Sequence, residues 1–103
     1  MIDGREIELM PEEIEVYNIV VTILLPYIQS ERITFMKSNG YFVVCIDNDE
    51  NKKVCKFYLN RYRDYYLIYF DDNKKEQKVS FSDFDDISGY YSERFIDTTL
   101  KFR

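Results

Sequence analysis

The stretch from Tyr41 to Phe70 constrains the fold of this chain more than any other. Two apolar runs, at 41–47 and 53–59, flank a polar loop, and a tyrosine-rich run at 65–70 follows a basic corner at 60–64. Short runs rich in β-branched and aromatic residues, separated by turn residues, are typical of antiparallel strands. The centre of the chain is therefore expected to form an antiparallel meander that the remaining segments cover.

Further strands are expected on either side of this stretch. Residues 33–37 precede an Asn39-Gly40 pair, which favours a hairpin turn, and residues 76–81 can pair as a short fifth strand. A first helix is expected from Pro11, whose fixed φ suits the start of a helix. Pro26 is expected to kink this helix or to end its regular part, and Ser30-Glu31 closes the element. A final helix is expected after Ser82, weakened but not ended by Gly89.

The first helix is apolar nearly all round. Its apolar residues recur at helical spacing on two faces, with Ile14, Tyr17, Val21, Leu24 and Ile28 on one and Val16, Val20 and Ile23 on the other. Such a helix is either enclosed in the core or shared with a partner. Val20 and Leu24 are therefore the candidate interface of a homodimer.

The sequence predicts one α+β domain over residues 11–103, preceded by an acidic, flexible lead at residues 1–10. A chain of 103 residues is large enough for a single core. A helix, four to five antiparallel strands and a C-terminal helix pack most simply with both helices on one face of the sheet. The other face is then open or shared with a partner.

Composition weighs against an enzyme. The chain has no histidine and so lacks the commonest general base and the commonest metal ligand. Asp47, Asp49 and Asn51 have the spacing that begins a calcium loop, but Lys52 stands where the loop needs glycine. We interpret this segment as a hairpin turn. No catalytic residue, cofactor, bound metal or small-molecule substrate is expected.

The charge and the ends of the chain bound its partners. Residues 1–15 carry six acids and one base, which accounts for the whole net charge of −5. The remainder is neutral, so the overall acidity does not exclude a nucleic-acid partner. Neither end has the pattern of a targeting signal, and no apolar run approaches the roughly 20 residues that span a bilayer. We expect a cytoplasmic protein with no membrane partner.

One candidate binding surface follows from strand parity. Along 53–59, Cys55, Phe57 and Leu59 alternate with Lys56 and Tyr58, which predicts that the first set points inward and the second outward. Rings that stack on bases, beside cations that meet phosphates, are typical of single-stranded nucleic-acid binding. Another interpretation stays open, in which Lys and Arg protect a sheet edge and Tyr reflects β-propensity. The candidate site comprises Lys56, Tyr58, Arg61, Arg63 and Tyr65, with Tyr66 as the alternative to Tyr65.

The two cysteines do not form a disulfide framework. A hairpin turning about Glu50 would place Cys45 and Cys55 opposite each other on adjacent strands. We expect two small, buried apolar side chains rather than a bridge.

Core and turn residues occur in a particular order along the chain, among them Glu13 and Tyr17 in the first helix, Val54-Cys55-Lys56 in the centre and Asp85-Asp86-Ile87 near the end. The order resembles the C-terminal domain of bacterial proteins related to the type I restriction enzyme R subunit, over Glu12 to about Phe102. The family's nuclease-like motif belongs to a separate N-terminal domain, so no catalytic residue is carried over. The resemblance implies an accessory module of a restriction-modification or phage-defence related protein. The residues that carry it are Glu13, Tyr17, Ile19, Val20, Ile23, Leu24, Glu31, Arg32, Ile33, Tyr41, Phe42, Asp47, Val54, Cys55, Lys56, Leu59, Asn60, Phe70, Asp71, Asp85, Asp86, Ile87 and Tyr90.

The leading hypothesis is a non-enzymatic binding module that contacts nucleic acid or a partner domain through an open Tyr/Lys/Arg sheet face. One alternative is a homodimerisation module. Another is a small acidic inhibitor of a defence nuclease, acting in phage counter-defence, whose acidic residues at 6–15 or 83–86 imitate phosphates.

Overall fold

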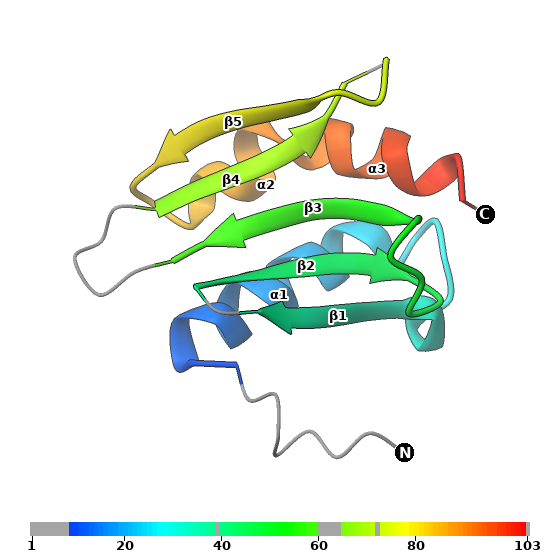
Figure 1. The fold of residues 1–103 in the computed structure, drawn as a ribbon, viewed down its shortest axis with the longest axis horizontal. Coiled ribbons are helices and arrows are strands. Elements are labelled where there is room, and N and C mark those ends of the chain that lie inside the picture. The colour runs from blue at the N-terminus through cyan, green and yellow to red at the C-terminus, as the bar shows by residue number, and fades with distance from the viewer. Residues whose placement is uncertain (1–8, 39, 60–64, 72, 103) are drawn as a thin grey trace.

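The chain folds as a helix, a five-stranded antiparallel meander and two C-terminal helices (Figure 1). The computed structural model describes residues 9–38, 40–59, 65–71 and 73–102. The strands follow one another in chain order, β1-β2-β3-β4-β5. The α+β class and the fifth strand are as predicted. The elements are α1 (Pro11–Leu24), η2 (Ser30–Arg32), β1 (Ile33–Ser38), β2 (Tyr41–Ile46), β3 (Lys53–Tyr58), β4 (Tyr65–Phe70), β5 (Glu76–Phe81), α2 (Asp85–Tyr90) and α3 (Ser92–Leu100).

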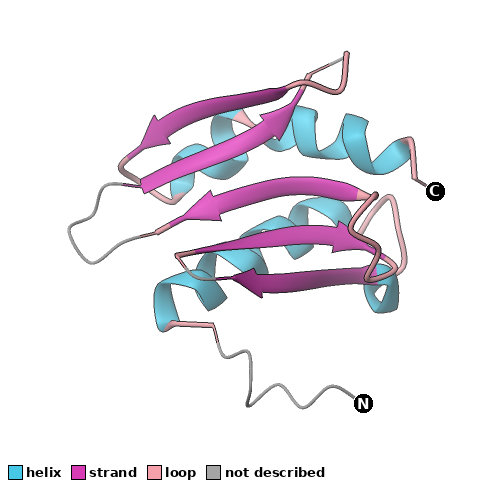
Figure 2. Ribbon diagram, in the orientation of Figure 1, coloured by secondary structure: helices cyan, strands magenta, loops and turns pink. Residues whose placement is uncertain are grey.

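All three α-helices lie on one face of the sheet, which confirms the predicted two-layer arrangement (Figure 2). The core lies between the layers, where Phe42, Phe57 and Leu67 of the sheet meet Val16 and Phe95 of the helices. All five are completely buried. None of the helices in the described part of the chain has both the length and the apolar character needed to cross a bilayer.

α1 buries the two residues that were predicted to form a dimer interface. Val20 and Leu24 are 0% exposed within a single copy of the chain, so the prediction that they form a dimer interface was wrong. Ile14, on the same apolar face as Leu24, is 47% exposed. The apolar stripe of this helix is wide, and periodicity cannot tell which of its lines is centred on the core. The buried line begins at Glu13, whose ion pair with Lys37 of β1 fixes the rotation of the helix.

The predicted final helix is two helices. α2 ends at Tyr90 and α3 begins at Ser92, because Tyr91, with φ −120° and ψ −1°, departs from helical geometry. Backbone bonds continue across the break, since the Tyr91 N–H donates to the Ile87 carbonyl and the Tyr91 carbonyl accepts the Phe95 N–H. Gly89 lies near the end of α2, and glycine has one of the lowest helix propensities of all residues.

The two cysteines do not face each other. Cys55 pairs with Val44 and Cys45 pairs with Lys53, because a β-bulge interrupts the β2–β3 ladder between these two positions. Their side chains therefore lie on opposite faces of the sheet, and both are free and buried. Burial raises the pKa of both thiols, that of Cys55 well above its usual value.

Residues 1–8 of the acidic lead lie outside the described residues, so its predicted flexibility is not tested over that segment. Leu9, which was included in the lead, is partly buried and packs against the core. The carboxylate of Glu13 accepts the N–H of Met10, the last residue of the lead, at 2.9 Å. The end of the predicted lead is thus attached to the domain.

Candidate nucleic-acid interface

Strand pairing brings three tyrosines into one row on the face of the sheet opposite the described helices. Tyr58 of β3 pairs directly with Tyr66 of β4. On the other side of Tyr58, its ring stacks on that of Tyr41 of β2, with centroids 5.0 Å apart and an interplanar angle of 30°. We call Tyr41, Tyr58 and Tyr66 the tyrosine row. All three rings are partly exposed, so the row presents aromatic surface across three adjacent strands.

Two lysines lie beside the tyrosine row. The ammonium group of Lys78, on β5, lies 4.6 Å from the ring centroid of Tyr66 and 5.9 Å from that of Tyr58. Lys56, on β3, has its Nζ 2.6 Å from the Glu76 carboxylate and a side chain only 15% exposed. One cation therefore lies against the aromatic rings, while the other is paired with an acid at the edge strand.

The second row of this face is apolar between the cations. Val43, Lys56, Ile68 and Lys78 are consecutive pairing partners across β2 to β5. Val43 and Ile68 are only 5% and 6% exposed although this face lies opposite the described helices. Long lysine side chains commonly lie along apolar neighbours while their charged ends stay in water. The open face is thus amphipathic, with few fully solvated positions at its centre.

The structure bears differently on each predicted site residue. Lys56 and Tyr58 lie on the open face, as strand parity predicted. Tyr65 does not, because it pairs with Phe81 and its ring packs 5.6 Å from that of Phe81 and 5.4 Å from that of Phe84 on the helix side. Tyr66 takes its place, since Leu67 occupies the core and alternation turns both of its neighbours. Arg61 and Arg63 lie outside the described residues.

Sequence reasoning missed Tyr41 and Lys78, and the bulge explains the first omission. The predicted turn about Glu50 sets Cys45 opposite Cys55, and this register would set Tyr41 opposite Leu59, which was predicted to point inward; Cys45 instead pairs with Lys53. Beyond the bulge, Phe42 pairs with Phe57, which brings Tyr41 to Tyr58. An extra residue in one strand reverses the alternation beyond it. Lys78 had a usable signal, because residue parity in β5 places it on the same face as Glu76 and Ser80.

The segment that begins like a calcium loop is a charged turn. The carboxylate of Asp47 accepts the Nε and Nη2 of Arg32 at 2.9 and 2.8 Å and the Nζ of Lys52 at 3.2 Å. These contacts, chiefly the hydrogen bonds from Arg32, lower the pKa of Asp47 to about 2. Asp49 accepts the Asn51 N–H, which closes the turn. Within the described ranges, no group of three or more His, Cys, Asp or Glu side chains could hold a metal ion.

No protein-family model, curated protein or solved structure matches this chain. The resemblance to the restriction-related family accordingly stays a prediction from the sequence. The tyrosine row with its flanking lysines presents aromatic rings beside cations on one face of the sheet.

Proposed function

We propose that this protein is a non-enzymatic module that binds single-stranded nucleic acid across the tyrosine row. One observation carries the proposal: three tyrosine rings are aligned over three adjacent strands, next to an ammonium group, on the face opposite the described helices. Bases of any sequence stack on aromatic rings, each typically contributing about 1–3 kcal/mol of binding free energy. The row offers a series of such platforms at the strand spacing of about 4.8 Å.

The flanking lysines supply the contacts to phosphate. Lys78 lies over Tyr58 and Tyr66 by a cation–π contact, and it vacates the ring faces when a base stacks there and its ammonium moves to the backbone. Lys56 exchanges its Glu76 partner for a phosphate in the same way. Both exchanges replace one favourable contact with another, so affinity comes mainly from stacking and salt sensitivity from the two cations. The sequence resemblance to restriction-related proteins supports the further proposal that such a module acts in phage defence, as an accessory part of a larger protein.

Fluorescence anisotropy of labelled oligonucleotides about 12 nucleotides long tests this proposal, at low and moderate salt. Tyr58→Leu removes the central platform and should weaken single-strand binding by roughly 5- to 150-fold, the equivalent of one lost stack. Lys78→Gln should reduce the slope of log K against log salt by about 0.7, since one phosphate contact is lost.

Matched controls come from the same chain. Tyr90, which is 75% exposed on α2, supplies a tyrosine away from the row, and Lys75, exposed in the β4–β5 turn, supplies a lysine. Tyr90→Leu and Lys75→Gln should leave binding within about twofold of the wild type, and circular dichroism checks that every variant is folded. The proposal fails if no oligonucleotide binds at low salt, if duplex binds as tightly as single strand, or if the controls weaken binding as much as Tyr58→Leu.

A further inference from the structure

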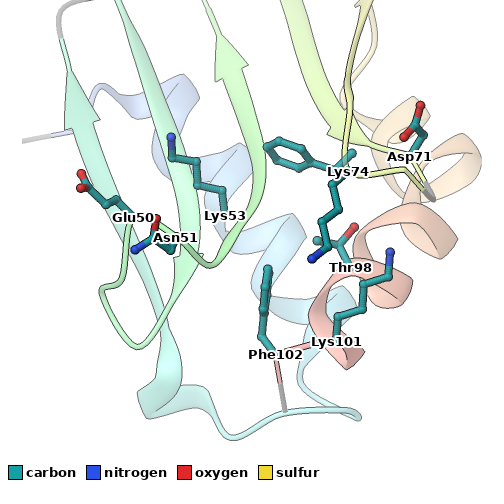
Figure 3. A pocket seen from close by; sticks show the side chains of 9 residues that line it. Glu50, Asn51, Lys53, Asp71, Lys74, Thr98, Lys101 and Phe102 are labelled. Atoms are coloured by element: carbon teal, nitrogen blue, oxygen red, sulfur yellow. The ribbon is translucent and has the colours of Figure 1, made fainter.

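A cavity lies at the other end of the strands from the tyrosine row. The pairing of β3 with β4 begins at Cys55 and Tyr69 and continues toward the tyrosine row. At the other end of these two strands, where they are not paired with each other, the C-terminal end of α3 lies behind the sheet (Figure 1). A cavity of about 430 Å³ opens there, lined by the β2–β3 loop, the β4–β5 turn and the end of α3 (Figure 3). Its volume falls in the range of small-molecule sites, about 300–1,000 Å³.

Three lysines contribute to the lining of the cavity. Lys53, Lys74 and Lys101 come from three different segments, and none of the ion pairs between described residues engages them. Two acids, Glu50 and Asp71, also line the cavity. With three lysines and two acids, the lining therefore carries one net positive charge.

Of these acids, Asp71 is already committed to its own turn. Its carboxylate accepts the N–H groups of Asn73 and Lys75 at 2.8 and 2.9 Å and the Nε2 of Gln77 at 2.9 Å. These bonds, that from the Lys75 N–H foremost, lower the pKa of Asp71. In Figure 3 its carboxylate points away from Phe102. The Asp71 carboxylate is thus engaged by donors of the β4–β5 turn, and the lysines that line the cavity stay available to a ligand.

Lys74, Thr98 and Lys101 form the polar wall of the cavity, and the ring of Phe102 lies across from them (Figure 3). The backbone of Lys74 is in the left-handed region, with φ 63°, as is common in a short hairpin loop, and its N–H donates to the Asp71 carbonyl to close the β4–β5 turn. The Thr98 and Thr99 carbonyls at the end of α3 accept the N–H groups of Lys101 and Phe102, which offsets the negative end of the helix.

We propose that this cavity binds a small organic anion that combines a phosphate with a planar ring, such as a mononucleotide. The ammonium groups of Lys74 and Lys101 and the Thr98 hydroxyl contact the phosphate, and Phe102 stacks on the ring. The site does not depend on the tyrosine row, because the two use different residues at opposite ends of the sheet.

Nuclear magnetic resonance titration of the ¹⁵N-labelled protein tests this site, with AMP, UMP, adenosine and inorganic phosphate as separate probes. The mononucleotides should shift the amide resonances of Lys74, Thr98, Lys101 and Phe102, and should bind more tightly than adenosine or phosphate alone. Lys74→Gln and Lys101→Gln should each weaken binding about tenfold, as expected for the loss of one charge-assisted hydrogen bond. Lys75→Gln, next to Lys74 but outside the lining, should change it by less than about twofold.

Four results would overturn the proposal: no saturable shift at millimolar mononucleotide, shifts centred on the tyrosine row, equal binding of inorganic phosphate and mononucleotides, or equal effects of Lys74→Gln and Lys75→Gln. Loss of oligonucleotide binding in Tyr58→Leu with the mononucleotide shifts intact shows that the two sites are separate. Failure of the tyrosine row to bind any oligonucleotide leaves the expected result of this titration unchanged.

Discussion

Glu13 shows how a single charged residue can fix the position of a helix. Its side chain is 1% exposed, and its carboxylate accepts the Nζ of Lys37 at 2.6 Å and the N–H of Met10 at 2.9 Å. A buried carboxylate is tolerated only when cations and donors surround it. The pair therefore fixes the rotation of α1 against β1 more than it adds to stability, because desolvation offsets most of its attraction.

Removing one partner of this pair should be far more damaging than removing both. Lys37→Met leaves the buried Glu13 carboxylate without its cation and should lower the free energy of unfolding by about 3–5 kcal/mol, measured by urea denaturation. The double variant Glu13→Leu with Lys37→Met should recover most of that loss, since two apolar groups then fill the space. A double variant no more stable than Lys37→Met would contradict this account.

Asp47 makes a contribution to the free energy of unfolding that is lost at acid pH. Its pKa is about 2 in the folded protein against an ordinary 3.8, so the folded state favours the ionised form. A lowered carboxyl pKa contributes stability above the unfolded pKa, and that contribution is lost as the pH falls from about 4 to about 2. Asp71, whose pKa is also lowered, acts in the same direction.

The Asp47→Asn variant should therefore lose part of its acid sensitivity. Its free energy of unfolding should fall less steeply than that of the wild type below pH 4, and Asp71 should keep the remaining slope above zero. Urea denaturation at pH 5, 4, 3 and 2 measures both slopes. Arg32→Gln removes the main hydrogen-bond donor to Asp47 and should flatten the curve similarly; identical curves for wild type and both variants would refute the assignment.

At the scale of elements, the two described glycines differ in backbone conformation. Gly40, in the β1–β2 turn, has φ +89°, a conformation that residues with a Cβ rarely adopt. Gly89 lies in α2 without such a φ. A Cβ added at either position would meet nothing within 4 Å, so only backbone preference distinguishes the two sites.

The same substitution should accordingly have opposite signs at these two positions. Gly40→Ala should destabilise the protein by about 1–2 kcal/mol through the left-handed conformation, whereas Gly89→Ala should stabilise it by about 0.4–1 kcal/mol by reducing the freedom of the unfolded chain. Thermal and urea denaturation of the two variants measure the difference. Equal effects would show that contacts rather than backbone conformation decide at one of them.

Strand existence and order could be predicted from the sequence, because turn residues and alternating side chains are local signals. The rotation of α1 about its axis and the register between β2 and β3 could not be predicted from the sequence. The side of α1 that is buried depends on the Glu13–Lys37 contact between two elements, and the membership of Tyr41 in the site depends on one bulge in the β2–β3 ladder. Parity placed Lys56 and Tyr58 correctly because both lie beyond that bulge, and it left Tyr65 and Tyr66 undecided because either could begin β4.

At the scale of the whole molecule, the meander separates two kinds of surface. The tyrosine row lies toward one end of the strands, and the turns at the other end surround the cavity with α3 behind them (Figure 1). The cavity combines residues from the middle and the end of the chain, so no local sequence motif predicts it. Lys53, Lys74 and Lys101 are separated by turns and strands, and only the packing of α3 behind the sheet brings them together.

The burial of β2 on both of its faces makes this strand the slowest to exchange its amide protons with solvent. Phe42, Val44 and Ile46 are completely enclosed on the helix side, and Val43 and Cys45 are 5% and 0% exposed on the other. Its amides should exchange only through global unfolding, and those of the edge strand β5, with exposed Lys78 and Ser80, through local opening. Deuterium exchange should therefore place the most persistent unit one strand away from the middle of the sheet, on the side that α1 covers.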